Sequence, residues 1–151
     1  MANRQTDRLK VCHSGSAAIE FGISLPLLAL LFVAVAEIGF TAYQSLQVQN
    51  AVEAGLVYAV KHGNDSTGIS AAVANSSNLA GITATPAPAQ FCGCPAASGI
   101  TTTSCTATCG SGNSSNQYLQ INASLTRLSI FPGSGLPLPA TLSARSIVRL
   151  N

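Results

Sequence analysis

A long apolar run near the N-terminus dominates the pattern of hydrophobic and polar positions. No charged residue occurs from Phe21 to Ala36, and the apolar character continues, with one interruption, as far as Tyr43. At about 1.5 Å per residue, a helix over residues 16–43 is long enough to cross the roughly 30 Å hydrocarbon core of a bilayer. The pattern therefore predicts a transmembrane helix over these residues, with Tyr43 at the interface and a kink at Pro26.

Two glutamates lie within this segment. A carboxylate in a membrane-spanning helix is disfavoured by roughly 2.5–3.5 kcal/mol on insertion scales, and such residues are functional by default. Glu20 lies near the start of the run, where the strongly apolar residues that follow offset its cost. We expect Glu37 near the outer boundary, either facing a protein partner or extending its carboxylate toward the headgroups.

The pattern changes to that of an amphipathic helix beyond Tyr43. Apolar residues recur there at intervals of three and four, as Val48, Val52, Leu56 and either Ala59 or Val60. Polar residues occupy the other faces, which is typical of a helix with one buried side. We therefore expect one helix from Ser16 to about His62, with residues 44–63 as a stem that ends at Gly63-Asn64.

Residues 64–151 are predicted to form a small head. Its first elements in chain order are a helix over 66–79, weak strands over 82–85 and 90–94, and a cysteine-bearing loop over 96–116. Asp65, Ser66 or Thr67 would cap the helix, because their side chains can accept a hydrogen bond from its free N–H groups.

The clearest strands lie near the C-terminus. Apolar and polar residues alternate over residues 118–128 and again over 141–150, which is the pattern of a strand with one buried face. An irregular connection rich in proline and glycine, residues 132–139, separates them. The sequence therefore predicts an α+β fold, in which a small antiparallel β-sheet packs on the stem of a long N-terminal helix.

Composition and charge limit what such a chain does. With 151 residues, the chain has room beside the long helix for one small domain. Only 8% of the residues are charged and the net charge is +2, so the basic surface of a nucleic-acid-binding protein is missing. Arg4, Arg8 and Lys10 precede the apolar run, and the next cation is Lys61. This asymmetry predicts a cytoplasmic N-terminus and a head outside.

The five cysteines divide into one and four. Cys12 precedes the membrane segment. The other four lie together in the predicted head, two in the weak strand over 90–94 and two in the loop over 96–116: Cys92, Cys94, Cys105 and Cys109. In an oxidising compartment we expect disulfides, and pairings that join one of the first two cysteines to one of the last two avoid short rings. Each closure would contribute roughly 3 kcal/mol. A four-thiolate zinc site is the alternative, although the spacings differ from the usual knuckles.

No constellation of residues indicates catalysis. The chain has two histidines, His13 near the N-terminus and His62 at a helix end, and few acids, so a nucleophile, a base and an acid cannot be assigned together. Glycine-rich tracts near Gly110 and Gly133 lack the lysine and hydroxyl residue of a phosphate-binding loop. We expect neither enzymatic activity nor a bound cofactor or metal.

Several segments of the chain resemble those of a known family. They are Gly15-Ser16-Ala17-Ala18-Ile19-Glu20-Phe21, Leu25-Pro26-Leu27-Leu28, Glu37-Ile38-Gly39, Asn50-Ala51-Val52-Glu53-Ala54-Gly55 and Tyr58-Ala59, with weaker similarity over 91–95 and 144–149. The chain is similar in these segments to the TadE-like family of pseudopilins, which act in the tight-adherence (Flp, type IVb) pilus system of bacteria. The resemblance is densest over residues 14–59 and implies a pilin-like fold.

The resemblance also implies proteolytic maturation at the inner membrane. A prepilin peptidase would remove a leader of residues 1–15 by cutting between Gly15 and Ser16, which places Glu20 at the fifth position of the mature chain, before Phe21. The protein would then be a single-pass minor pseudopilin with a periplasmic or extracellular head. Its implied partners are other pilins, the inner-membrane assembly platform and membrane lipid, and both a place in the fibre and a role in assembly alone stay open.

The chemistry of Glu20 is consistent with this role. Cleavage before Ser16 exposes an α-amine that is cationic at neutral pH. In a low dielectric this amine would pair with an anion, which Glu20 of the same or a neighbouring helix supplies. The small residues Gly22, Ser24 and Ala29 allow helices to approach closely.

Two other interpretations retain the same helix but assign it a different cleavage or a different role. The tripeptide Ala34-Val35-Ala36 suits signal peptidase, which would release a secreted protein beginning at Glu37. The length of the run and the presence of Glu20 in it argue against this cut. The other alternative is a single-span membrane-anchored module whose disulfide-stabilised head binds a partner.

Overall fold

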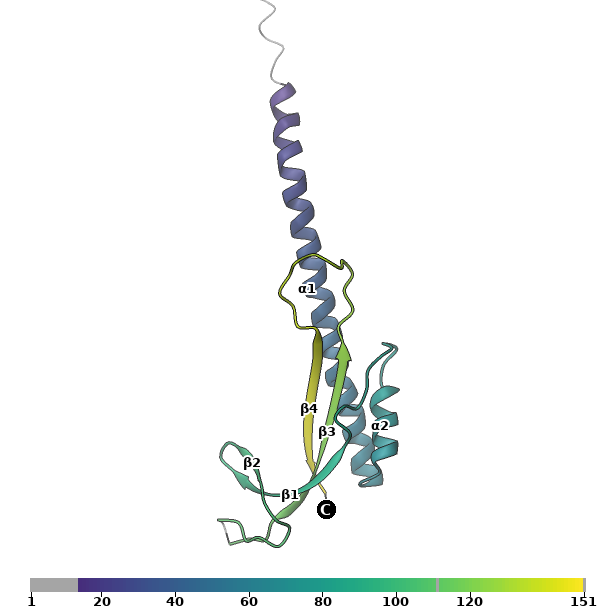
Figure 1. The fold of residues 1–151 in the computed structure, drawn as a ribbon, viewed down its shortest axis with the longest axis vertical. Helices are drawn as coiled ribbons and strands as arrows, with labels where there is room; N and C mark the ends of the chain where they lie inside the picture. Colours follow the sequence, from purple (N-terminus) through teal and green to yellow (C-terminus); the bar gives the residue numbers. More distant parts are fainter. Residues whose placement is uncertain (1–13, 111, 151) are drawn as a thin grey trace, which may run out of the picture.

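The described part of the chain has an α+β fold, as the sequence predicts. The structure, a computed structural model, describes residues 14–110 and 112–150. Its elements in chain order are α1 (Ser14–His62), α2 (Ser66–Ala74), β1 (Ala89–Ala96), β2 (Gly99–Thr102), β3 (Asn116–Thr126) and β4 (Thr141–Arg149). The strands form one antiparallel sheet in the order β2-β1-β3-β4. Figure 1 shows α1 projecting far beyond a head that is built around its second half.

The long helix α1 is the axis of the molecule. It runs without interruption over 49 residues and begins at Ser14, slightly earlier than expected. Pro26 lies inside α1 and does not end it, because a proline removes one helical hydrogen bond while its neighbours keep theirs. The last turn carries Lys61 and His62, and Gly63 follows at a φ of 73°, which is the left-handed cap predicted from the sequence.

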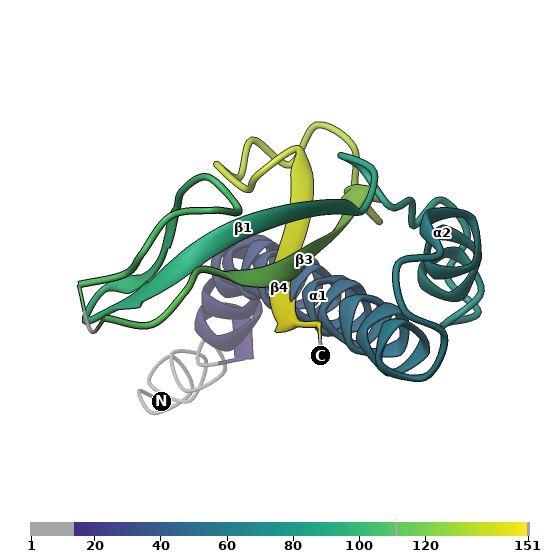
Figure 2. The ribbon, with the colours of Figure 1, turned by 90° about the horizontal axis from the view of Figure 1, so that it is seen from below.

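The head packs on one face of α1. Figure 2 shows the sheet curling over α1 on one side, with α2 lying beside the helix on another. Most of the buried apolar residues form one cluster, which contains Val48, Ala51, Val52, Ala59, Ile69, Val73, Ile82, Leu119, Ile121, Ala123, Leu125 and Leu142. Gly55 lies at a close approach of α1 to α2 and β3, since an added Cβ would come within 2.7 Å of Val73 and 3.2 Å of Ile121. The predicted packing of a small sheet on an amphipathic stem is confirmed.

Helix α2 is shorter than predicted. It begins after the predicted cap Asp65, whose side chain accepts a hydrogen bond from the Gly68 N–H at 3.0 Å. It ends at Ala74, well before the end of the predicted range. The hydroxyl of Ser76 donates to the carbonyl of Val73 at 2.8 Å, so a polar side chain competes for the hydrogen bonds that would continue the helix.

Two predictions for the strands are wrong. Residues 82–85 form no strand, and their link to the sheet is a single bridge between Thr83 and Ser124. The loop predicted over 96–116 contains β2, which pairs with β1 after a turn in which Gly99 has a φ of 125°. The residues of β2 are mostly β-branched and favour a strand, but their polar composition gave the appearance of a loop.

The remaining strands agree with the prediction. Strand β1 covers the predicted range and extends it at both ends, β3 begins and ends slightly earlier than expected, and β4 matches almost residue for residue. Most of the predicted leader lies outside the described residues, including Arg4, Arg8, Lys10, Cys12 and His13. The topology argued from these cations therefore stays a prediction.

Candidate functional site

The residues of the predicted processing site lie at the free end of α1. Gly15 and Ser16 fall in its first turns. Glu20 and Phe21 are exposed, and Phe21 leaves 65% of its surface accessible. The head begins much farther along the helix (Figure 1). Glu20 and Phe21 are therefore not covered by the head, whereas cleavage between Gly15 and Ser16 stays a prediction.

The apolar part of α1 exposes its side chains on every face. Ile23, Leu30 and Phe32 leave 72%, 68% and 73% of their surfaces accessible. The helix is long and apolar enough to cross a membrane, and none of its most apolar window is buried inside the protein. So much exposed apolar surface is unfavourable in water. These observations fit a protein that is anchored in a membrane by α1.

Glu37 is the first buried residue after this exposed stretch, and its side chain is completely buried. Donors from the chain after β3 surround its carboxylate. The guanidinium of Arg127 donates to Oε2 at 3.0 Å and forms an ion pair. The hydroxyl of Ser129 donates to Oε1 at 2.8 Å, and the N–H of Phe131 donates to the same oxygen. Glu37 thus faces its own head, and its carboxylate does not extend toward the headgroups.

Gln44, two turns farther along the same face, makes a second contact with this segment. Its Nε2 donates to the Leu128 carbonyl at 2.8 Å, and its Oε1 accepts from the Leu128 N–H at 2.9 Å. Between the two, the buried hydroxyl of Thr41 donates to the Glu37 carbonyl at 2.8 Å. Residues spaced by three and four lie on one helix face. We call Glu37 and Gln44, together with residues 127–131, the polar clamp.

Arg127 also closes the base of the loop that carries the clamp. Its backbone N–H donates to the Ala140 carbonyl at 2.9 Å, and its Nε donates to the Pro139 carbonyl at 3.1 Å. We call residues 127–140 the shoulder loop, because they connect β3 and β4 beside α1 where the head begins (Figure 1). One side chain therefore joins both ends of this loop to Glu37.

The polar clamp is not predicted from the hydrophobicity pattern, because that pattern assigns residues up to Tyr43 to the membrane. The spacing of the clamp residues continues into the buried positions Val48 and Ala51, so the buried stripe of α1 begins at Glu37. A search for this stripe by spacing alone, whatever the polarity of its members, would find the clamp. Arg127, a cation at the end of a predicted strand, is the feature of the head sequence that would indicate a partner for Glu37.

The four cysteines of the head form two disulfides, Cys92–Cys105 and Cys94–Cys109. The Cα atoms of the two pairs are 5.0 and 5.5 Å apart. The prediction of disulfides is confirmed, and the pairing is one of the two that join the first two cysteines to the last two. The bonds tie the β1–β2 hairpin to the loop that leads into β3.

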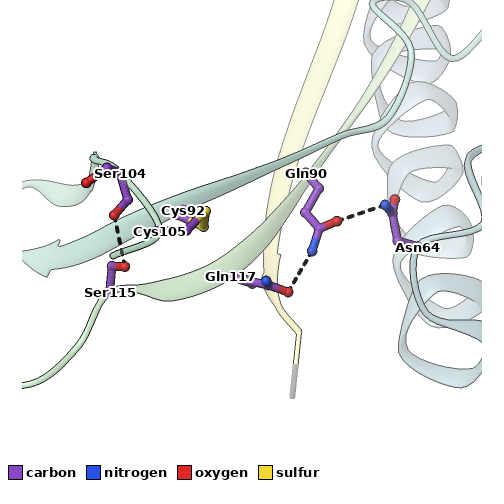
Figure 3. The surroundings of a disulfide bond; sticks show 7 residues. All are labelled: Asn64, Gln90, Cys92, Ser104, Cys105, Ser115 and Gln117. Carbon is purple, nitrogen blue, oxygen red and sulfur yellow. Dashed lines mark hydrogen bonds between the residues drawn. A yellow bond between two sulfur atoms is a disulfide. The ribbon is translucent and has the colours of Figure 1, made fainter. Parts of the chain in front are cut away.

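A chain of amide side chains connects these strands to the stem. Asn64, after the end of α1, donates to Gln90 Oε1 at 2.9 Å, and Gln90 donates to Gln117 Oε1 at 2.8 Å (Figure 3). Near the first disulfide, the hydroxyl of Ser115 donates to the Ser104 carbonyl at 3.0 Å. The hairpin is therefore held by polar contacts as well as by covalent bonds.

Asp65 and Tyr58 form a charged hydrogen bond at the turn between α1 and α2. The Gly68 N–H donates to Asp65 Oδ1 at 3.0 Å, and the Tyr58 hydroxyl donates to Oδ2 at 2.9 Å. These hydrogen bonds, the one from Gly68 first, lower the pKa of Asp65 from its ordinary value of 3.8. The bond to Asp65 raises the pKa of Tyr58 above its ordinary 10.0. The acid is thus charged over most of the pH range.

A shallow hollow lies where the segment before β1 crosses β3 and β4. Its lining consists of Thr85, Pro86, Asn122, Ala123, Ser143, Ala144 and Arg145. The Asn122 amide already donates to the Pro86 carbonyl at 3.2 Å. Elsewhere in the described residues, no group of three or more His, Cys, Asp or Glu side chains is placed to hold a metal ion. The most distinctive features of the chain are therefore the exposed helix, the polar clamp and the disulfide-bonded hairpin.

Comparison with known proteins agrees with the resemblance seen in the sequence. The model of the family described as TadE-like protein matches residues 15–56. This range contains the predicted cleavage site, the apolar part of α1 and the two clamp residues of that helix, Glu37 and Gln44. No curated protein and no solved structure gives a match to the chain.

Proposed function

We propose that this chain, whose first helix matches the TadE-like family, is a minor pseudopilin of a bacterial tight-adherence (Flp, type IVb) pilus. In this proposal a prepilin peptidase cuts between Gly15 and Ser16 and removes a leader of residues 1–15. The mature protein is a single-pass protein of the inner membrane with its head in the periplasm or outside the cell. It acts in pilus assembly or adhesion with other pilins and the assembly platform, and we assign no catalytic step to it.

The observation that carries the proposal is the coincidence of the family match with the exposed end of α1. The match begins at Gly15, next to the proposed cut, and the exposed apolar surface is described from Ala18 to Ala36. Glu20 is the acid within this surface. A helix that merely held the head at a membrane would gain nothing from a carboxylate there, because the charge opposes insertion.

In this proposal Glu20 allows one mature helix to recognise another. After the cut, Ser16 carries an α-amine that is cationic at neutral pH. In a low dielectric this amine pairs with the Glu20 carboxylate of a neighbouring helix, and the pair sets the register of the two helices more than it adds stability. The small residues Gly22, Ser24 and Ala29 leave room for the neighbour.

The substitution Glu20→Ala in the native host tests the proposal. We expect normal insertion into the membrane, because the cost of burying the charge is removed. We also expect few assembled pili and weak surface adhesion, since the amine has lost its partner. Electron microscopy of the cells and an adhesion assay measure both results.

Glu53→Ala is the matched control, because Glu53 is an exposed glutamate on the stem and lies outside the apolar surface. This variant should assemble normally. Normal piliation by Glu20→Ala would contradict the proposed role of the carboxylate.

A second candidate function is a membrane-anchored binding module. The two disulfides and the amide chain that hold the β1–β2 hairpin favour it, because a rigid, exposed hairpin is suited to recognition. Under this alternative Glu20→Ala would be silent, whereas replacing the hairpin by a short turn would abolish binding of the partner and leave the membrane anchor intact.

A further inference from the structure

We propose that the shoulder loop is a membrane-interface element, whose apolar side chains rest in the headgroup region of the same bilayer that α1 crosses. This inference goes beyond the proposed function. It rests on membrane anchoring by α1 alone, so it applies equally to a pseudopilin before assembly and to a simple anchored protein.

The chemistry of the loop suits a lipid surface. Leu128, Ile130 and Phe131 leave 50%, 48% and 43% of their surfaces accessible. No charged residue occurs from Leu128 to Ala144. Neighbouring exposed apolar side chains in an uncharged stretch mark a surface that is covered by a partner or a membrane. The loop therefore needs an apolar neighbour.

The position of the loop along α1 identifies that neighbour as the bilayer. Residues 16–36 of a helix span about 30 Å, which equals the thickness of the hydrocarbon core. Glu37, directly after this stretch, accepts a hydrogen bond from the N–H of Phe131. Gln44 forms hydrogen bonds with both the N–H and the C=O of Leu128. The exposed apolar side chains thus continue the apolar surface of α1 at its outer boundary. Under this proposal the span ends near residue 36 rather than at Tyr43.

The irregular backbone of the shoulder loop limits how deeply the loop enters the membrane. An irregular segment cannot lie in the hydrocarbon, because its unpaired N–H and C=O groups would find no partners there. The headgroup region supplies water and ester oxygens. Pro132, Pro137 and Pro139 have no N–H to satisfy. Tyr43, which is 50% exposed between the two clamp residues of α1, is a residue type that is enriched at this level of a membrane.

Because the shoulder loop is attached to α1, its contact with the bilayer affects the position of the whole head. Two side chains of α1 hold the shoulder loop, and Arg127 joins its two ends. The loop is therefore fixed relative to the helix. When its apolar side chains rest on the bilayer, they set the height of the head above the membrane and the direction in which it faces.

Single tryptophan variants test the proposal, because the chain contains no tryptophan of its own. Phe131→Trp reports on the shoulder loop, Phe32→Trp on the membrane span and Val57→Trp on an exposed position of the stem. The full chain is reconstituted into phosphatidylcholine and phosphatidylglycerol vesicles that contain lipids brominated either near the headgroup or deep in the acyl chain. Iodide in the buffer serves as the aqueous quencher.

We expect bromines near the headgroup to quench Phe131→Trp most strongly, and deep bromines to quench Phe32→Trp. Val57→Trp should respond to iodide and to neither lipid. Ile130→Trp repeats the measurement on the loop if Phe131→Trp lacks the circular dichroism spectrum of the wild type.

Three results would overturn the proposal. If the loop variant behaves like Val57→Trp while Phe32→Trp is quenched by lipid, the shoulder loop faces water. Membrane anchoring by α1 is then supported and the inference about the loop is wrong. If the loop variant responds to neither lipid nor iodide, a second copy of the chain covers the loop. If Phe32→Trp is not quenched by lipid, membrane anchoring by α1 fails together with the inference.

Discussion

A single carboxylate, that of Glu37, fixes the shoulder loop of the head on the long helix. Its oxygens accept hydrogen bonds from Arg127, Ser129 and Phe131, all of which lie in the shoulder loop. A buried ion pair adds little net stability over an apolar contact, but removal of one partner leaves the other buried and uncompensated. The clamp therefore acts mainly as a positioning device, which holds one segment of the head at one height on α1.

Glu37→Ala should release the shoulder loop without unfolding the sheet. The amide of Phe131 should exchange its hydrogen at least about tenfold faster, because a hydrogen bond to a charged acceptor changes a local opening equilibrium by at least that factor. The amides of β3 should keep their protection. Hydrogen exchange with mass spectrometry on the full chain in detergent measures both, with Glu53→Ala as the control. Unchanged exchange at Phe131 would mean that the carboxylate does not hold the loop.

Asp65 makes the stability of the fold depend on pH in the acid range. The Gly68 N–H and then the Tyr58 hydroxyl lower the pKa of this carboxyl in the folded protein. Such a group stabilises the fold above its unfolded pKa, near 3.8, and this contribution is lost as the pH falls through the lower pKa of the folded state. We expect Asp65→Asn to have a lower Tm than the wild type at pH 6, and the difference to shrink once the pH falls below 3.8. Circular dichroism melts across the range test this, and a constant difference would contradict it.

At the scale of elements, one glycine permits α1, α2 and β3 to meet. An added Cβ at Gly55 would lie 2.7 Å from Cγ2 of Val73 and 3.2 Å from Cγ2 of Ile121, whereas at Gly39 it would meet nothing within 4 Å. Because both glycines lie in the same helix, they form a matched pair that separates packing from helix propensity.

Gly55→Val should destabilise the protein by about 1–3 kcal/mol, since the extra methyl groups force neighbouring side chains and backbone apart. Gly39→Val, the same substitution at an open position, should be neutral or slightly stabilise the helix, because valine has a higher helix propensity than glycine. Thermal and chemical unfolding of the full chain in detergent gives both values. If Gly55→Val were as stable as the wild type, the close approach of the three elements would be wrong.

The elements also show why part of the fold was predictable. In β3 and β4 the alternation of apolar and polar residues reflects the face that packs on the core, so both strands were predicted to within two residues of their observed ends. The buried face of α1 begins with Glu37 and Gln44, which a hydrophobicity pattern does not assign to a core. Their burial depends on donors in residues 127–131, far along the chain. The pairing of four cysteines likewise depends on how the chain folds, and not on their spacing alone.

At the scale of the whole molecule, the structure joins an exposed apolar helix to a head that is fixed to its second half. The core residues of α1, the polar clamp and the hydrogen bond from Asn64 to Gln90 fix the head at successive levels of the stem. A helix that packs into a membrane or into a fibre therefore carries the head in a defined orientation. This rigid coupling is the property that the proposed assembly role requires, since the register set at Glu20 would then position every head.

The proposed role as a pseudopilin depends most on how the N-terminus is processed. The most direct test is the intact mass and N-terminal sequence of the protein extracted from the membranes of its native host under non-reducing conditions. We predict a mature chain that begins at Ser16 and retains both disulfides. A chain that begins at Met1 would indicate a plain membrane anchor, and one that begins at Glu37 would indicate a secreted domain; either result would contradict the proposed pseudopilin.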